Sequence, residues 1–221
     1  MMTEKIFWLA PGVRFEDQLC YASTTKLETK LCPHRPEHTM RSRWGRPLKV
    51  VGPVRPVTDF EWTVYGDVIV SQTMAEAFGK AGFSGVQLLP VEFYTSTETP
   101  FGRESVELRV NGWGGNAPAS SGIHEIERCT YCGHRIFSGY SCPERLFNLE
   151  DWDGSDLFLI WPLPRYMMVT GRVRDFILDS KYTGVRLRRL AELPRVVAGT
   201  LTPGNLADWF DDERVHMIER G

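Results

Sequence analysis

The sequence predicts an α+β fold: two related strand–helix–strand units packed around a mixed sheet, with a zinc-knuckle-like insertion. The first observation behind this is that Trp62–Leu88 matches Trp161–Leu187 without a gap. The second is that both segments place a hydroxyl residue, a helical apolar pattern and a Gly-Val pair after a short apolar run. We therefore expect one domain over residues 1–221, with a pseudo-repeat at about 32–94 and 129–190.

The first copy reads as strand, helix and strand. The run DVIV ends at Val70, and Ser71 then offers a hydroxyl to the free N–H groups of a helix start. Gly82 can end the helix in a left-handed cap, and Gly85–Tyr94 resumes as a strand. The positions of one helix face follow the spacing i, i+3, i+4, i+7, namely Met74, Ala77, Phe78 and Ala81.

The second copy repeats this order. Tyr166–Val169 is the expected strand, Thr170 the expected cap and Gly184–Leu190 the closing strand. Trp62 and Trp161 occupy matching positions, and we expect both to anchor their copies in the core. The matching helix face comprises Val173, Phe176, Ile177 and Ser180.

Length and composition narrow the function classes. A chain of 221 residues can bury a sizeable core, and its net charge of −2 gives no support to a dedicated nucleic-acid binder. The longest apolar run, near Leu157–Leu163, is too short to span a bilayer, and the start of the chain lacks a signal-peptide pattern. We expect a cytoplasmic protein that has no membrane partner.

The cysteines point to metal rather than to disulfides. There are five of them, an odd number, and no export signal accompanies them. Cys129, Cys132 and the following Gly133 form C-x-x-C-G, the knuckle of zinc ribbons, in which two thiolates fit one tetrahedral ion. A redox role is less favoured, because the residues after Cys132 do not read as the helix that lowers a reactive thiol's pKa.

The first copy holds a partial echo of this knuckle. The segment CPHR lies over CGHR, so that Cys32 stands where Cys132 stands, with His38 close by. The preferred site is a structural zinc ion held by Cys32, His38, Cys129 and Cys132, since four protein ligands leave no open position for catalysis. Alternatives replace the Cys32–His38 pair with other nearby donors, namely Cys142, His134, His124 or His34, and free thiols without a metal also remain possible.

Motifs of catalysis are not found. The glycines of Asn111–Pro118 read as a turn, because no Lys-Ser/Thr and no helix follow them, and neither H-E-x-x-H nor G-x-S-x-G occurs. The basic stretch Arg41–Pro56 surrounds Trp44 and could bind single-stranded nucleic acid, but we expect a solvated, mostly extended loop. We therefore predict no enzymatic activity and no small-molecule substrate.

The knuckle and the repeated unit together resemble the double-CxxCG paralogous family of myxobacteria and related immunity proteins of bacterial polymorphic-toxin systems. The segment Val68–Val91 carries the recurring pattern, and the resemblance covers about Cys32–Val91 and Cys129–Leu190. The first half departs from the pattern, since it has Cys32 without the rest of a CxxCG.

The resemblance implies a non-enzymatic protein that binds and neutralises a cognate toxin protein. The alternative function is a zinc-ribbon-containing nucleic-acid-binding or regulatory adaptor, with nucleic acid the less favoured partner because of the chain's charge.

Overall fold

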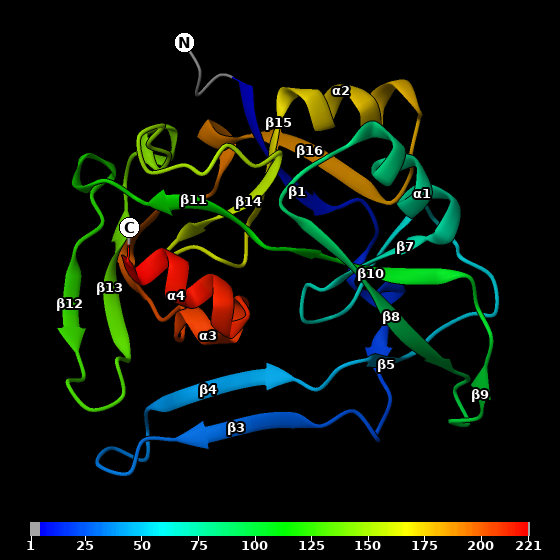
Figure 1. The fold of residues 1–221 in the computed structure, drawn as a ribbon, viewed down its shortest axis with the longest axis horizontal. Coiled ribbons are helices and arrows are strands. Elements are labelled where there is room, and N and C mark those ends of the chain that lie inside the picture. Colours follow the sequence, from blue (N-terminus) through cyan, green and yellow to red (C-terminus); the bar gives the residue numbers. More distant parts are fainter. Residues whose placement is uncertain (1–4, 221) are drawn as a thin grey trace.

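The structure is a computed structural model that describes residues 5–220, without the side chains at positions 40 and 41 (Figure 1). It contains short helices and strands in mixed sheets, so the predicted α+β class is confirmed. None of the helices within the described part of the chain is long and apolar enough to cross a membrane. The helices are α1 (Gln72–Ala81), α2 (Gly171–Asp179), α3 (Leu206–Trp209) and α4 (Asp212–Arg220).

Two large sheets form the body of the molecule. The first has the order β2-β5-β8-β10-β7-β6, with β9 added beside β8. Its strands are β2 (Cys20–Tyr21), β5 (Leu48–Val51), β6 (Phe60–Trp62), β7 (Val68–Ser71), β8 (Val86–Tyr94), β9 (Pro100–Phe101) and β10 (Ser105–Val110). The second has the order β11-β14-β15-β1-β16. Its strands are β11 (Gly112–Asn116), β14 (Leu157–Trp161), β15 (Met167–Thr170), β1 (Ile6–Pro11) and β16 (Val185–Arg189).

Two smaller sheets extend from this body. One is the hairpin of β3 (Leu27–Leu31) and β4 (Thr39–Trp44). The other consists of β12 (Glu125–Arg128), β13 (Arg135–Tyr140) and β17 (Val196–Leu201). In Figure 1 the β3–β4 hairpin runs along the lower edge of the molecule, and β12 and β13 stand at its left side.

Both predicted strand–helix–strand units form, as β7–α1–β8 and β15–α2–β16. Ser71 caps α1 as expected, since its Oγ accepts a hydrogen bond of 3.2 Å from the backbone N–H of Met74, and Gly82 ends the helix with φ of 65°. Thr170 stands at the N-cap position of α2, as predicted, but its side chain makes no capping hydrogen bond. Its hydroxyl donates instead to Asp156, at 3.2 Å.

The two copies exchange strands. In the first sheet β10 lies between β7 and β8 and is antiparallel to both. In the second sheet β1 takes the same place between β15 and β16, again antiparallel to both. Because β1 precedes the first unit in the chain and β10 precedes the second, each half of the chain contributes its first strand to the sheet of the other half. This relation was not apparent from the sequence.

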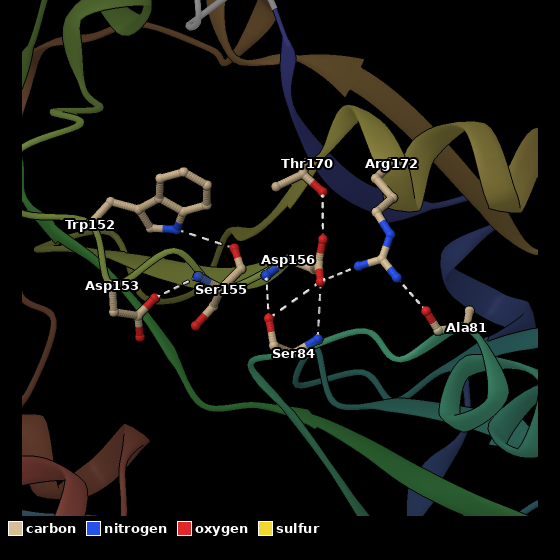
Figure 2. A network of polar contacts seen from close by, with 8 residues as sticks. All are labelled: Ala81, Ser84, Trp152, Asp153, Ser155, Asp156, Thr170 and Arg172. Atoms are coloured by element: carbon tan, nitrogen blue, oxygen red, sulfur yellow. Dashed lines mark hydrogen bonds and ion pairs between the residues drawn. The ribbon is translucent and has the colours of Figure 1, made fainter.

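Two equivalent sets of aspartate hydrogen bonds join the two copies. Figure 2 shows one of them: Asp156 Oδ2 accepts hydrogen bonds from the backbone N–H and the hydroxyl of Ser84, at 3.1 and 3.3 Å. In the other, Asp59 Oδ2 accepts from the backbone N–H and the hydroxyl of Thr183, at 2.8 and 2.7 Å. In each copy, therefore, one aspartate binds the residue that precedes the Gly-Val pair of the other copy. A pseudo-twofold relation between the copies requires this reciprocity.

The repeated glycines lie at the points where the copies touch. Gly85 and Gly184 have φ of 78° and 81°, in the left-handed region that favours glycine. A Cβ at Gly85 would overlap the carbonyl oxygen of Leu157, and one at Gly184 would overlap that of Phe60. The recurrence of the Gly-Val pair is thus explained by a close backbone approach that each copy makes to the other.

The matched tryptophans are not structurally equivalent. Trp62 pairs with Val68 in the first copy. The counterpart of Val68 in the second copy is Met167, and Met167 pairs with Leu159 rather than with Trp161. The expected match of Trp62 with Trp161 was therefore wrong in register, because the second hairpin has a longer turn. Both tryptophans are nevertheless buried, in different apolar clusters.

The main apolar cluster is shared by both copies. Met74 and Phe78 of α1 and Val173 and Ile177 of α2 belong to it, as the helical spacing predicted. Ser180 does not, because α2 ends at Asp179 and the Ser180 side chain is exposed.

The glycine-rich segment after β10 is a strand and not the predicted turn. Gly112–Asn116 forms β11, which runs parallel to β14. A Cβ at Gly112 would overlap the carbonyl oxygen of Leu157, and one at Gly114 would overlap the ring of Phe158. Glycine here permits close packing of β11 against its neighbour, a tertiary reason that a local turn signal does not contain.

Candidate metal centre

Two hairpin turns that carry cysteines meet at one side of the molecule. The β3–β4 turn is closed by a hydrogen bond of 3.0 Å from the Cys32 N–H to the His38 carbonyl. The β12–β13 turn is closed in the same way, by a bond of 2.8 Å from the Cys129 N–H to the His134 carbonyl. The two turns lie side by side at the lower left of Figure 1, although they come from different halves of the chain.

Three cysteine sulfurs gather where the turns meet. The Sγ atoms of Cys32, Cys129 and Cys132 all lie within 4.8 Å of one another. Cys32 and Cys129 are buried, with 2% and 5% of their surface exposed. Since a Zn–S bond is about 2.3 Å long, the sulfurs of a tetrahedral site lie roughly 3.8 Å apart. The three residues therefore fit a metal ion with only small adjustments of their side chains.

The backbone around the knuckle favours a thiolate at Cys129. The backbone N–H of Cys132, then the ring of His38 and the backbone N–H of Tyr131, lower the pKa of the Cys129 thiol to about 6. Gly133 has φ of 72°, in the left-handed region that favours glycine, and its N–H donates to the Cys129 carbonyl at 2.9 Å, which closes the turn. Burial, by contrast, raises the pKa of Cys132 to about 11. One thiol is thus already poised as a metal ligand, and the second lies in an environment where an added positive charge would be stabilising.

His38 lies beside the three sulfurs. Its Nδ1 is 3.9 Å from the Sγ of Cys132, and only 6% of the residue is exposed. It is not a member of the group whose ligand atoms all lie within 4.8 Å. Its ring stacks on that of His134, with centroids 4.4 Å apart. Of the four predicted ligands, the structure therefore brings three together and places the fourth at the edge of the cluster.

The alternative ligands have other partners. The ring of His34 stacks on Tyr131 with centroids 3.7 Å apart, and His124 Nδ1 lies 3.1 Å from the hydroxyl of Ser138. Cys142 lies 3.6 Å from the Ser141 hydroxyl. None of these residues belongs to the cluster of metal-ligating atoms that the described residues form. His134 is the nearest alternative, because it stacks on His38.

The turns are equivalent in a register that differs from the sequence match. Because Cys32 and Cys129 make the same closing hydrogen bond, Cys32 stands where Cys129 stands, and the prediction that it replaces Cys132 was wrong. By the same spacing, the place of Cys132 is taken in the first turn by Arg35, whose side chain forms an ion pair with Glu127. A gapless match of CPHR with CGHR conceals this, because the first turn is one residue longer.

Comparison with known protein families and with curated protein sequences finds no match for this chain. The resemblance to the double-CxxCG family therefore stays a prediction.

The basic stretch near Trp44 contributes to a polar network that sequence reasoning missed. Arg46 contacts Glu107 twice, through Nε at 2.7 Å and Nη2 at 2.8 Å, and the Glu107 side chain is only 2% exposed. The expected solvated loop was therefore wrong at Arg46. The available signal was Glu107, the one acidic residue of β10, because a carboxylate that is buried in a strand requires a partner.

Proposed function

We propose that the protein is an immunity protein, which binds and neutralises a toxin protein without catalysing a reaction. The observation that carries the proposal is the doubled cysteine turn. Cys32 and Cys129 hold equivalent positions in two hairpin turns that meet. A doubled turn of this kind is what the resemblance to the double-CxxCG family implies, even though Arg35 now occupies the place of one cysteine.

The site also supplies a physical reason for binding. A protein that binds tightly benefits from a surface whose shape is fixed before its partner arrives. The cysteine cluster joins the β3–β4 hairpin to the β12–β13 turn, and β3 is exposed along its whole length. We propose that a metal at the cluster keeps this exposed hairpin in place, so that the hairpin forms part of the binding surface. Free thiols need a reducing compartment, which favours the cytoplasm.

We propose zinc as that metal, with His38 as the fourth ligand beside the three cysteines. Three thiolates and one imidazole form a closed tetrahedral set of the kind that structural zinc sites use. His38 supports this role because it is buried and its Nδ1 already lies 3.9 Å from one of the sulfurs. Arg35 cannot serve, since a guanidinium has no lone pair to offer a metal.

The zinc proposal predicts a metal content that can be measured. Protein purified without chelators should contain about one zinc ion per chain by elemental analysis. Replacing His38 with alanine should weaken zinc binding by more than about a hundredfold in a chelator competition, because a direct ligand is lost and even the loss of an outer-shell partner costs about tenfold to a hundredfold. His124→Ala is the matched control, since His124 is exposed and contacts Ser138. Wild-type protein that contains less than about a fifth of an equivalent of any metal would refute the zinc site.

The immunity function predicts specific protection. When this protein is co-expressed with the toxin whose gene lies next to its own, the cells should grow. Cells that produce the protein together with an unrelated toxin should still die. The purified pair should form a complex of equal stoichiometry by size-exclusion chromatography with light scattering. Asp179→Asn should leave protection unchanged, because Asp179 is an exposed carboxylate and interface energy concentrates in a few buried side chains.

Other outcomes would overturn the proposal. Rescue without any physical complex would exclude neutralisation by binding. Salt-sensitive binding to oligonucleotides, with no binding to the toxin, would favour the nucleic-acid-binding adaptor. One arginine of the basic stretch, Arg46, already contacts the buried Glu107, which leaves the stretch one cation fewer for a nucleic acid.

A further inference from the structure

A large cleft opens between the β3–β4 hairpin and the first sheet. Its volume is about 960 Å³. Glu28 and Trp44 line it from the hairpin, Arg109 from β10, and Trp209 from the C-terminal segment. Cys32, His38, Cys129 and Cys132 do not line it, but His134, whose ring stacks on His38, does, so the cleft lies next to the cysteine cluster without including its sulfurs.

Arg109 faces this cleft without an ionic partner. One of its guanidinium nitrogens donates to the carbonyl oxygen of Trp209 at 3.0 Å. Among the described residues no carboxylate lies within 4.0 Å of it, and Glu107 and Asp211 act on it only from farther away. Burial, together with the positive charges of Arg46 and Arg43, lowers the pKa of Arg109. A half-buried cation among like charges is a position where an incoming anion is strongly favoured.

The carboxylates near Arg109 do little to neutralise its charge. Glu107 is held by both contacts from Arg46. Burial and the charge of Glu107 raise the pKa of Asp67 to about 7, so a substantial fraction of Asp67 is neutral at neutral pH. A second cation, Arg165, also lines the cleft, is exposed, and forms no ion pair with any described residue. Glu28 and Asp208 line the cleft too, but Glu28 pairs with Arg43, and Asp208 accepts hydrogen bonds from the backbone N–H groups of Ser42 and Asn205. Among the described residues, Arg109 and Arg165 are therefore the lining arginines that form no ion pair.

The rim of the cleft has the character of a protein interface. Trp44 and Tyr65 lie against each other there, with ring centroids 5.1 Å apart, and 65% of Tyr65 is exposed. Leu27 of the hairpin lines the cleft and is 47% exposed. Aromatic residues and arginine are enriched in protein interfaces, where they carry much of the binding energy. The volume lies at the upper limit for small-molecule pockets, which together with the open aromatic rim favours a segment of polypeptide.

We propose that this cleft receives an acidic, extended segment of a partner protein, and that Arg109 binds a carboxylate of that segment while Trp44 and Tyr65 pack against its apolar side chains. The proposal deepens the proposed immunity function, and rests on it for the identity of the partner as a toxin. A guanidinium suits this role because it can bind a carboxylate through two parallel hydrogen bonds.

A synthetic peptide tests the cleft without the toxin. The probe is an acetylated, amidated pentapeptide of alternating glutamate and phenylalanine, and its control carries lysine in place of glutamate. Binding is followed by tryptophan fluorescence, since Trp44 and Trp209 line the cleft. We expect the acidic peptide to bind at least tenfold more tightly than the lysine peptide, and to bind less tightly as salt rises. Equal affinity for both peptides would overturn the proposal.

Variants then assign the binding to Arg109. Arg109→Gln should weaken binding of the acidic peptide at least tenfold, whereas Arg109→Lys, which keeps the charge but not the fork, should give an intermediate loss. Arg186→Gln is the matched control, because Arg186 is exposed on β16 and does not line the cleft. Unfolding temperatures of all variants establish that the proteins are folded. Unchanged affinity in both Arg109 variants would overturn the proposal, as would adenosine monophosphate binding more tightly than the peptide.

Measuring toxin binding distinguishes the cleft proposal from the immunity function. If Arg109→Gln weakens the toxin complex at least tenfold, the cleft is part of the immunity interface. If the complex forms with undiminished affinity in this variant, the cleft proposal fails and the immunity function stands. If the acidic peptide binds through Arg109 while no toxin complex forms, the immunity function fails and the cleft proposal stands.

Discussion

Replacing Gly184 with alanine should destabilise the protein by about 3–5 kcal/mol, one of the largest effects that a single methyl group can have. Two causes add. The residue has φ of 81°, a conformation in which a Cβ costs about 1–2 kcal/mol. The new Cβ would also overlap the carbonyl oxygen of Phe60 and lie 2.7 Å from the Cβ of Thr58, so the contact between the two copies would have to open. Chemical denaturation measures the change in unfolding free energy.

A matched glycine separates these two causes. Gly154 has φ of 84°, but a Cβ there would meet nothing within 4 Å. Gly154→Ala should therefore cost only the backbone term of about 1–2 kcal/mol. By the pseudo-twofold relation, Gly85→Ala should be as harmful as Gly184→Ala, because its Cβ would overlap the carbonyl of Leu157. Equal costs for Gly154→Ala and Gly184→Ala would show that the close approach contributes nothing.

Replacing Cys129 and Cys132 together with serine should remove the metal and loosen both hairpins. The cluster joins turns from two halves of the chain, so its loss frees the β3–β4 hairpin, whose first strand is exposed throughout. If the proposed zinc contributes about 5 kcal/mol to folding, the unfolding temperature should fall by about 10–20 °C. Elemental analysis should find no zinc, and hydrogen exchange should be faster across Leu27–Leu31 and Thr39–Trp44.

Cys20→Ser provides the control for this double substitution. Cys20 is exposed and lies outside the cluster, so the variant should keep both its zinc and its unfolding temperature. A double variant whose unfolding temperature matched that of wild type would show that the cluster does not hold the hairpins together, whatever metal it binds.

Features that depend on residues near in sequence were predictable. The helical spacing identified Met74 and Phe78, the hydroxyl of Ser71 identified the start of α1, and Gly82 identified its end. The α+β class followed from the same local patterns. Cys129 and Cys132 could be predicted as candidate metal ligands because two thiols spaced by two residues can reach one ion without help from the rest of the fold.

Features that depend on distant contacts were not predictable. Thr170 stands at the start of α2, but its hydroxyl donates a hydrogen bond to Asp156, which lies before β14, and not to the helix. The glycines of β11 look like a turn because their purpose, close contact with β14, is visible only in three dimensions. The charged surroundings of Arg109 were not predictable either, since Arg43, Arg46 and Asp211 come near it from other parts of the chain.

The position of β1 has a consequence for how the chain must be made. Residues 6–11 are synthesised well before their partners β15 and β16, which end at Thr170 and Arg189. The first sheet is also incomplete until β10 has emerged. The second sheet therefore cannot form until β16 has emerged, and β1 stays an unpaired apolar strand while the segment between them is synthesised. Such a protein gains one cooperative native state at the cost of a long interval in which it depends on protection from aggregation.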